Sequence, residues 1–161
     1  MNPALQSWLT IPAVIEKAVD GLSDGDLDKR GGADGASIRE TVHHLVEANL
    51  IAANIMLAAL ASERTVTYDW SWVWPNVAWM QRMGYNTAPI VPALQTLHAL
   101  CDYYVVIIEN IPNGLSREVQ LLDSPGAAIY SKSVEDILVQ ESKHVEEHIR
   151  DIAEIRAKEG K

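Results

Sequence analysis

The segment from Ser133 to Lys158 repeats apolar residues at spacings of three and four, the period of an amphipathic helix. The aliphatic positions of this face are Val134, Ile137, Leu138, Val145, Ile149, Ile152 and Ile155. Glu141 and His148 fall within the same face, and His144 lies at its edge. An unpaired imidazole or carboxylate in an apolar interior costs on the order of 1–3 kcal/mol, so we expect a polar partner between these groups. A metal ion is the simplest such partner.

Three other segments have the same helical periodicity. They run from about Ala4 to Leu22, from Ser37 to about Ala61 and from Ala88 to about Asn110. Pro12 is expected to kink or split the first of them. The second begins with Ser-Ile-Arg-Glu, the form of a capping box. This helix is expected to be the most buried, with its polar sector at Arg39, Glu40, His43, Glu47 and Asn54.

The segments between these helices are long and rich in turn-forming residues. Residues 24–36, 63–87 and 111–131 are all predicted to be loops, with a short helix beginning at Pro75 in the second of them. Loops between helices are usually shorter, so at least one connection is predicted to cross the bundle. The fold class predicted is therefore all-α, a four-helix bundle with long connecting loops, formed by residues 1–161 as one domain.

Composition narrows the class of function. With 161 residues and 48% hydrophobic content, the core is large enough to be stable without disulfides or a structural metal, so a metal would serve function. The net charge of −9 argues against nucleic acid as a partner. The single Cys101 and the lack of a basic, then apolar N-terminus predict a cytoplasmic protein. We also expect no membrane partner, because no uncharged apolar run reaches the length of a bilayer span.

Histidines at positions i and i+4 of a helix can bind one ion, and a catalytic site then needs a third ligand from elsewhere. In the 37–61 helix, His44 falls beside Ile51 and Ile55, whereas His43 falls in the polar sector, so His44 is the preferred third ligand. The alternative is that these are core histidines bonded to the backbone or to carboxylates. For the set of three, we favour metal ligation.

Four motifs occur along the chain: Gly21-Leu22-Ser23, Ser37-Ile38-Arg39-Glu40, His44-Leu45 and His144-x-x-x-His148. With these motifs the chain resembles the DinB-like family of damage-inducible metal-binding proteins. The resemblance covers most of the chain and implies a four-helix bundle in which His44, His144 and His148 bind one divalent ion. Family members often have a tryptophan before the serine of the capping box, where this chain has Ala36. Relatives include thiol-dependent transferases or isomerases and hydrolase-like proteins, so the resemblance leaves the substrate open.

The predicted activity is that of a mononuclear enzyme in which a divalent ion (zinc, nickel or iron) activates a thiol or water against a small molecule. Glu141 is the candidate catalytic residue, as the proton acceptor. It is also a candidate for orienting a histidine, for a fourth ligand, or for a plain ion pair. A low-molecular-weight thiol is the possible second substrate. Whether the protein is an enzyme stays open at this point.

Two alternatives remain. The spacings Glu40-x-x-His43 and Glu141-x-x-His144, completed by Glu16 and Glu109, match a ferritin-like di-iron protein. A non-catalytic metal-binding or dimerisation module is the second alternative, supported by the tryptophans at positions 70, 72, 74 and 79. These side chains are predicted to pack the loop onto the bundle, to line a ligand pocket or to form a homodimer contact, and packing is slightly preferred.

Overall fold

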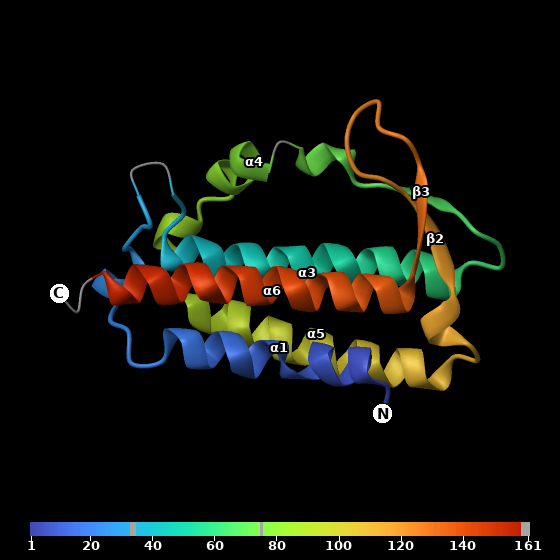
Figure 1. The fold of residues 1–161 in the computed structure, drawn as a ribbon, viewed down its shortest axis with the longest axis horizontal. Helices are drawn as coiled ribbons and strands as arrows, with labels where there is room; N and C mark the ends of the chain where they lie inside the picture. Colours follow the sequence, from blue (N-terminus) through green and yellow to red (C-terminus); the bar gives the residue numbers. More distant parts are fainter. Residues whose placement is uncertain (33–34, 75, 159–161) are drawn as a thin grey trace.

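Four long helices form the body of the structure, a computed structural model that describes residues 1–32, 35–74 and 76–158 (Figure 1). The helices are α1 (Pro3–Val19), α3 (Ile38–Ala61), α5 (Ile90–Asn110) and α6 (Val134–Ala157). Helix α1 packs on α5 and α6, and α3 packs on the same two helices. The predicted four-helix bundle is thus confirmed. Pro12 lies inside α1, so the helix continues through it.

Capping boxes begin both helices that carry the candidate site. The Ser37 side chain accepts a hydrogen bond from the backbone N–H of Glu40, and the Glu40 carboxylate accepts one from the Ser37 N–H at 2.8 Å. Ser133 and Asp136 make the same reciprocal pair at the start of α6. Each box satisfies two backbone donors that a helix start leaves unpaired. Local sequence therefore determines where these two helices begin.

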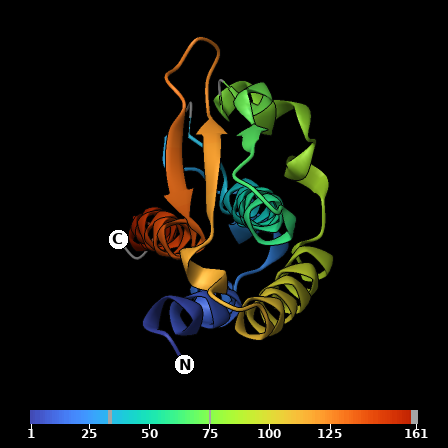
Figure 2. The ribbon, with the colours of Figure 1, turned by 90° about the vertical axis from the view of Figure 1, so that its right-hand side faces the viewer.

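The connection from α3 to α5 runs back along the length of the bundle. Helices α3 and α5 point the same way, and α1 and α6 point the opposite way (Figure 1). A chain that leaves one end of α3 must therefore return to the other end before α5 begins. The connection does so above α3, on the side where the strands also lie (Figure 2). This confirms that one long connection crosses the bundle.

A three-stranded sheet replaces two of the predicted loops. Its strands are β1 (Thr67–Asp69), β2 (Glu118–Leu122) and β3 (Tyr130–Ser133), in the order β1-β2-β3. β1 pairs with β2 in parallel, and β2 pairs with β3 antiparallel. The prediction of loops was wrong here because strands of three to five residues are too short to show a period of two.

Short helices also occur inside the predicted loops. Helix α2 (Asp24–Leu27) begins with its own capping box, formed by Ser23 and Asp26. Helix α4 (Asn76–Arg82) lies in the connection from α3 to α5, residues 62–89, which is called the crossover below. A short helix was predicted here, although Pro75, its predicted first residue, lies outside the described residues. The prediction of a loop over residues 24–36 is wrong at α2.

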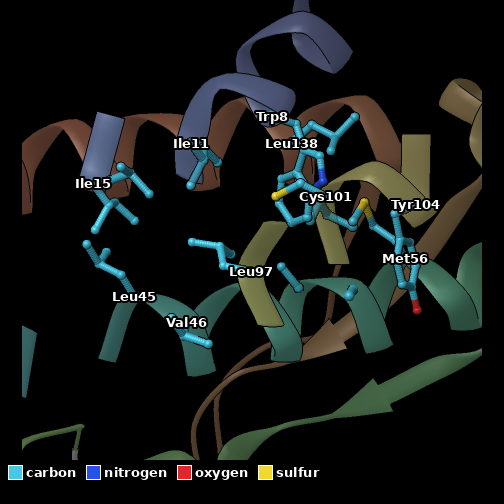
Figure 3. Close-up of a cluster of buried hydrophobic side chains, with 14 of the residues drawn as sticks. Trp8, Ile11, Ile15, Leu45, Val46, Met56, Leu97, Cys101, Tyr104 and Leu138 are labelled. Carbon is cyan, nitrogen blue, oxygen red and sulfur yellow. The ribbon is translucent and has the colours of Figure 1, made fainter. Parts of the chain in front are cut away.

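The core fills the space between the four long helices (Figure 3). Its largest fully buried side chains include Trp8, Ile15, Leu45, Met56, Leu97 and Leu138, which come from all four helices. Cys101 is also fully buried, and burial raises the pKa of its thiol to about 12. This cysteine therefore acts as a small apolar core residue, as its position on the apolar face of its helix indicates.

Arg39 is buried, although the sequence places it in the polar sector of α3. Its guanidinium donates hydrogen bonds to Asp28 at 2.8 Å and to Asp24 at 3.1 Å, and to the backbone carbonyl of Ala88. The prediction was wrong because α2, the residue after it and the residues just before α5 close over this end of α3 and supply the partners of the charge. Arg39 thus ties two connections to the helix that carries His44.

Two helices are long and apolar enough to cross a bilayer by length and composition alone. They are α3, with a mean hydropathy of 1.5, and α5, with 1.3. Core helices of globular proteins pass the same test, and 56% of the α3 window is buried inside the protein. The observation is weak evidence for a membrane span.

Candidate metal centre

The structure brings the rings of His44, His144 and His148 together between α3 and α6. The Nε2 atom of His144 lies 3.3 Å from Nε2 of His44 and 3.1 Å from Nε2 of His148. One ring nitrogen from each residue lies within 4.8 Å of the other two. Among the described parts of the chain, this is the group of His, Cys, Asp and Glu side chains whose spacing suits a metal ion.

The two distances from His144 match those between ligands of a single tetrahedral ion. Ligand nitrogens bonded at about 2.0–2.1 Å in a tetrahedron lie roughly 3.3 Å from one another. The two distances from His144 Nε2 are 3.3 and 3.1 Å, close to that edge length. Hydrogen bonds among the three rings satisfy these nitrogens less well than a cation would. The single Nε2 lone pair of His144 would have to accept hydrogen bonds from both His44 and His148. The donor set is therefore one that a divalent cation satisfies.

Carboxylates on α6 hold two of the three rings. Glu141 Oε2 lies 3.3 Å from Nδ1 of His144, and Asp151 Oδ2 lies 3.2 Å from Nδ1 of His148. A carboxylate at Nδ1 keeps the proton there and leaves Nε2 free as a ligand. Of the roles considered for Glu141, its contact with His144 favours ring orientation. Its role in the site stays a prediction.

Asp151 did not emerge from the sequence analysis, although a signal was present. The spacing His148-x-x-Asp151 mirrors Glu141-x-x-His144, and residues three apart on a helix are neighbours. His44 differs from the other two ligand candidates, because its Nδ1 is buried and has no hydrogen-bond partner. Its ring is instead held by Trp79, which packs against it with the ring centroids 5.6 Å apart.

Burial favours the neutral imidazole of His44 and of His148, which is the form that binds a metal. Burial lowers the pKa of His44 from 6.5 to about 3, and positive charge on His144 or His148 lowers it further. Burial likewise lowers the pKa of His148, with His144 adding to this effect and Asp151 opposing it. At neutral pH, His44 and His148 therefore need not lose a proton before an ion binds.

The lowered pKa of His44 predicts acid sensitivity of the metal-free protein. Its pKa is about 3 in the folded chain and about 6.5 when unfolded, so only the unfolded chain takes up this proton as the pH falls from 6.5 towards 3. Stability is thus lost in that window. We expect His44 alone to lower the free energy of unfolding by about 2 kcal/mol between pH 7 and pH 5. Urea unfolding with a chelator present measures this, and an equal loss in His44→Gln would contradict it.

A pocket of about 750 Å³ opens beside the histidines. His44 and His144 line one end of it, together with Glu141 and Glu147. Trp70 and Trp79 also line the pocket, whereas Trp72 and Trp74 are each 58% exposed. The tryptophans thus divide between a ligand pocket and the surface.

The structure does not bring the di-iron candidates together. His43 stacks on Tyr85 and bonds the carbonyl oxygen of Ala88, and Glu40 closes the capping box and pairs with Arg30. Glu16 on α1 pairs instead with His98 on α5, 2.9 Å away. His43 is also separate from the three-histidine group, in agreement with the preference for His44.

Comparison with solved structures shows a similar architecture in YfiT from Bacillus subtilis. The TM-score is 0.81, with 22% sequence identity, covering 98% of this chain and 86% of that chain. The two chains share a fold. YfiT is described as a probable metal-dependent hydrolase with an unusual four-helix bundle topology. No family model and no curated protein sequence matches this chain, so the likeness supports the DinB-like fold while family membership stays a prediction.

Removing the carboxylates is expected to weaken metal binding without unfolding the protein. Partners of ligand histidines typically contribute about 10- to 100-fold in metal affinity. We expect the larger loss for Glu141→Ala, whose side chain is 12% exposed, and the smaller loss for Asp151→Ala, which is 62% exposed. Glu154→Ala, an exposed acidic position on the same helix, is the matched control. Calorimetric titration with zinc would contradict the assignment if all three variants bound alike.

Proposed function

We propose that this protein is a mononuclear divalent-metal-dependent hydrolase acting on a small molecule, with His44, His144 and His148 as the ligands. The observation that carries the proposal is the approach of the Nε2 atoms of His44 and His148 to that of His144, beside a pocket. Two carboxylates that hold the rings from behind support it further. The description of YfiT, which shares the fold, supports hydrolysis as the reaction class.

Three neutral imidazoles would leave a divalent ion its full charge, and such an ion supplies Lewis acidity and lowers the pKa of a bound water to about 7. This chain's own residues position the ligand atoms: Glu141 holds the ring of His144, and Asp151 holds the ring of His148. Trp79 covers His44 and limits the access of bulk water from that side. Glu147 lines the same end of the pocket and is placed to accept a proton there.

The nature of the ion and of the second substrate belongs to the same proposal. Three histidine ligands suit zinc, nickel or iron, because imidazole binds all of them well. The pocket volume of about 750 Å³ is within the range of small-molecule sites. The thiol-dependent transferase implied by the family resemblance, the homodimer and the cytoplasmic location all remain predictions.

Elemental analysis of protein purified without an affinity tag tests the proposal. We expect one ion per chain, lost on chelation and restored by adding zinc, nickel or iron. Hydrolysis of a panel of simple esters and amides is expected only from the reloaded protein. His98→Ala, outside the site, is the control for histidine loss. Two ions per chain would favour the di-iron alternative, and none after reloading would overturn the proposal.

A further inference from the structure

The pocket continues away from the histidines along α3. His44, Ala48 and Ala52 follow one another at intervals of one helical turn, and all three line the pocket. Ile51 and Ile55 line it beside them. The two alanines leave room along the helix, and the path between the histidines and Ile55 has no charged side chain on the α3 side. The α3 side of this pocket, from His44 to Ile55, is therefore an apolar groove that starts at the candidate metal centre.

The other walls add more apolar surface. Trp70, Val73 and Trp79 from the crossover line the pocket, and so does Leu121 from β2. These segments lie above the α3 and α6 helices (Figures 1 and 2). Helix α6 lines the pocket mainly with polar and charged side chains, among them Asp136, Gln140 and Lys143, and also with Ile137 and Val139. A ligand in this groove thus meets apolar side chains from α3 and the crossover and mostly polar ones from α6.

The length of this groove limits the length of the ligand that it can hold. A helix rises about 1.5 Å per residue, so Ala52 lies about 12 Å and Ile55 about 16 Å along α3 from His44. An extended chain of single bonds advances roughly 1.2 Å per bond, so about ten bonds reach Ala52. No α3 residue after Ile55 lines the pocket, so the groove along α3 ends there, and Leu121 of β2 and its partner Tyr130 of β3 also line the pocket.

We propose that this groove binds a linear apolar chain of roughly eight to ten carbons, as in the acyl group of an ester or amide whose carbonyl lies at the histidines. The inference rests on the proposed function for the reaction itself. Hydrolysis would break the bond between the carbonyl carbon and the leaving oxygen or nitrogen. Water supplies hydroxyl to the carbon and a proton to the leaving group, so no oxidant or further reactant is needed.

Binding of n-alkanols to the chelator-treated protein tests the groove without any metal or catalysis. Tryptophan fluorescence is a direct readout, because Trp70 and Trp79 line the groove. From butanol to decanol we expect affinity to rise roughly two- to fourfold per methylene, with a plateau at longer chains. Ala48→Leu is expected to abolish the rise of affinity with chain length beyond the first few carbons, because the larger side chain narrows the groove one turn from His44.

Two further variants keep the result interpretable. Ala99→Leu, at an exposed position of α5, is the matched control and should leave the chain-length dependence unchanged. Ile51→Ala removes apolar wall without adding bulk and should weaken the long alkanols more than the short ones. Thermal unfolding of each variant reports whether it is folded.

A parallel series of p-nitrophenyl esters with the metal-loaded protein separates the two proposals. Rising kcat/KM with acyl length, lost in Ala48→Leu, supports both. Alkanol binding that depends on chain length without any ester hydrolysis keeps the groove and counts against the hydrolase. Alkanol affinities that are flat with length, or equal in wild type and Ala48→Leu, overturn the inference whatever the hydrolase assay gives.

Discussion

His144→Ala is expected to abolish binding of the divalent ion. Its Nε2 lies within 3.3 Å of the corresponding atom in both other histidines, so it is the central member of the cluster. Metal sites of this kind bind with on the order of 10 kcal/mol or more, and loss of one of three protein ligands should weaken zinc binding by more than about 1,000-fold. Hydrolytic activity of the reloaded protein should be lost with it.

The control for this variant is His43→Ala, because His43 neighbours His44 in sequence and stacks on Tyr85 outside the cluster. It should retain one ion per chain. Calorimetry with zinc and elemental analysis after dialysis measure both variants. If His144→Ala kept the wild-type affinity and stoichiometry, the three histidines would not form a common site, and the proposed function would have to be abandoned.

Trp8→Ala is expected to cause the largest loss of stability among the core substitutions considered. Trp8 has no exposed surface and belongs to the core cluster that also contains Leu138 of α6 and Cys101 of α5 (Figure 3). Replacing a buried tryptophan with alanine removes apolar contacts and leaves a cavity, at a cost of about 3–5 kcal/mol. Urea unfolding with a chelator present measures the free energy of unfolding without a contribution from metal binding.

Trp8→Phe separates packing from hydrogen bonding at the same position. The indole N–H of Trp8 is buried with no hydrogen-bond partner, so its removal costs no hydrogen bond. We therefore expect a much smaller loss for Trp8→Phe than for Trp8→Ala. Similar losses in the two variants would mean that the indole N–H, and not the packed ring, stabilises the protein.

The helical part of the fold could be predicted because its signals are local. The boxes at Ser37 and Ser133 and the spacing of apolar residues lie within each helix, so a single segment contains all the information. The sheet could not be predicted in this way. β1 pairs with β2, whose residues lie about fifty positions later, and neither strand is long enough to show alternation.

Part of the candidate site likewise follows from local sequence, and part depends on contacts between distant segments. His144 and His148 are brought together by one turn of helix, and the choice of His44 over His43 follows from the apolar face of α3. The carboxylate of Asp151 is also within one turn of His148. The pocket, in contrast, takes its walls from four separate parts of the chain, including β2, β3 and the crossover.

The amino-acid sequence by itself determined the four long helices, their starting points and the faces on which the three histidines lie, because those properties depend on residues within a few turns of one another. Only the tertiary structure decided that the crossover returns above α3, that Arg39 is buried, and that a groove runs from the histidines to the sheet. These features depend on contacts between distant segments, and a periodic pattern within one segment carries no information about its partner.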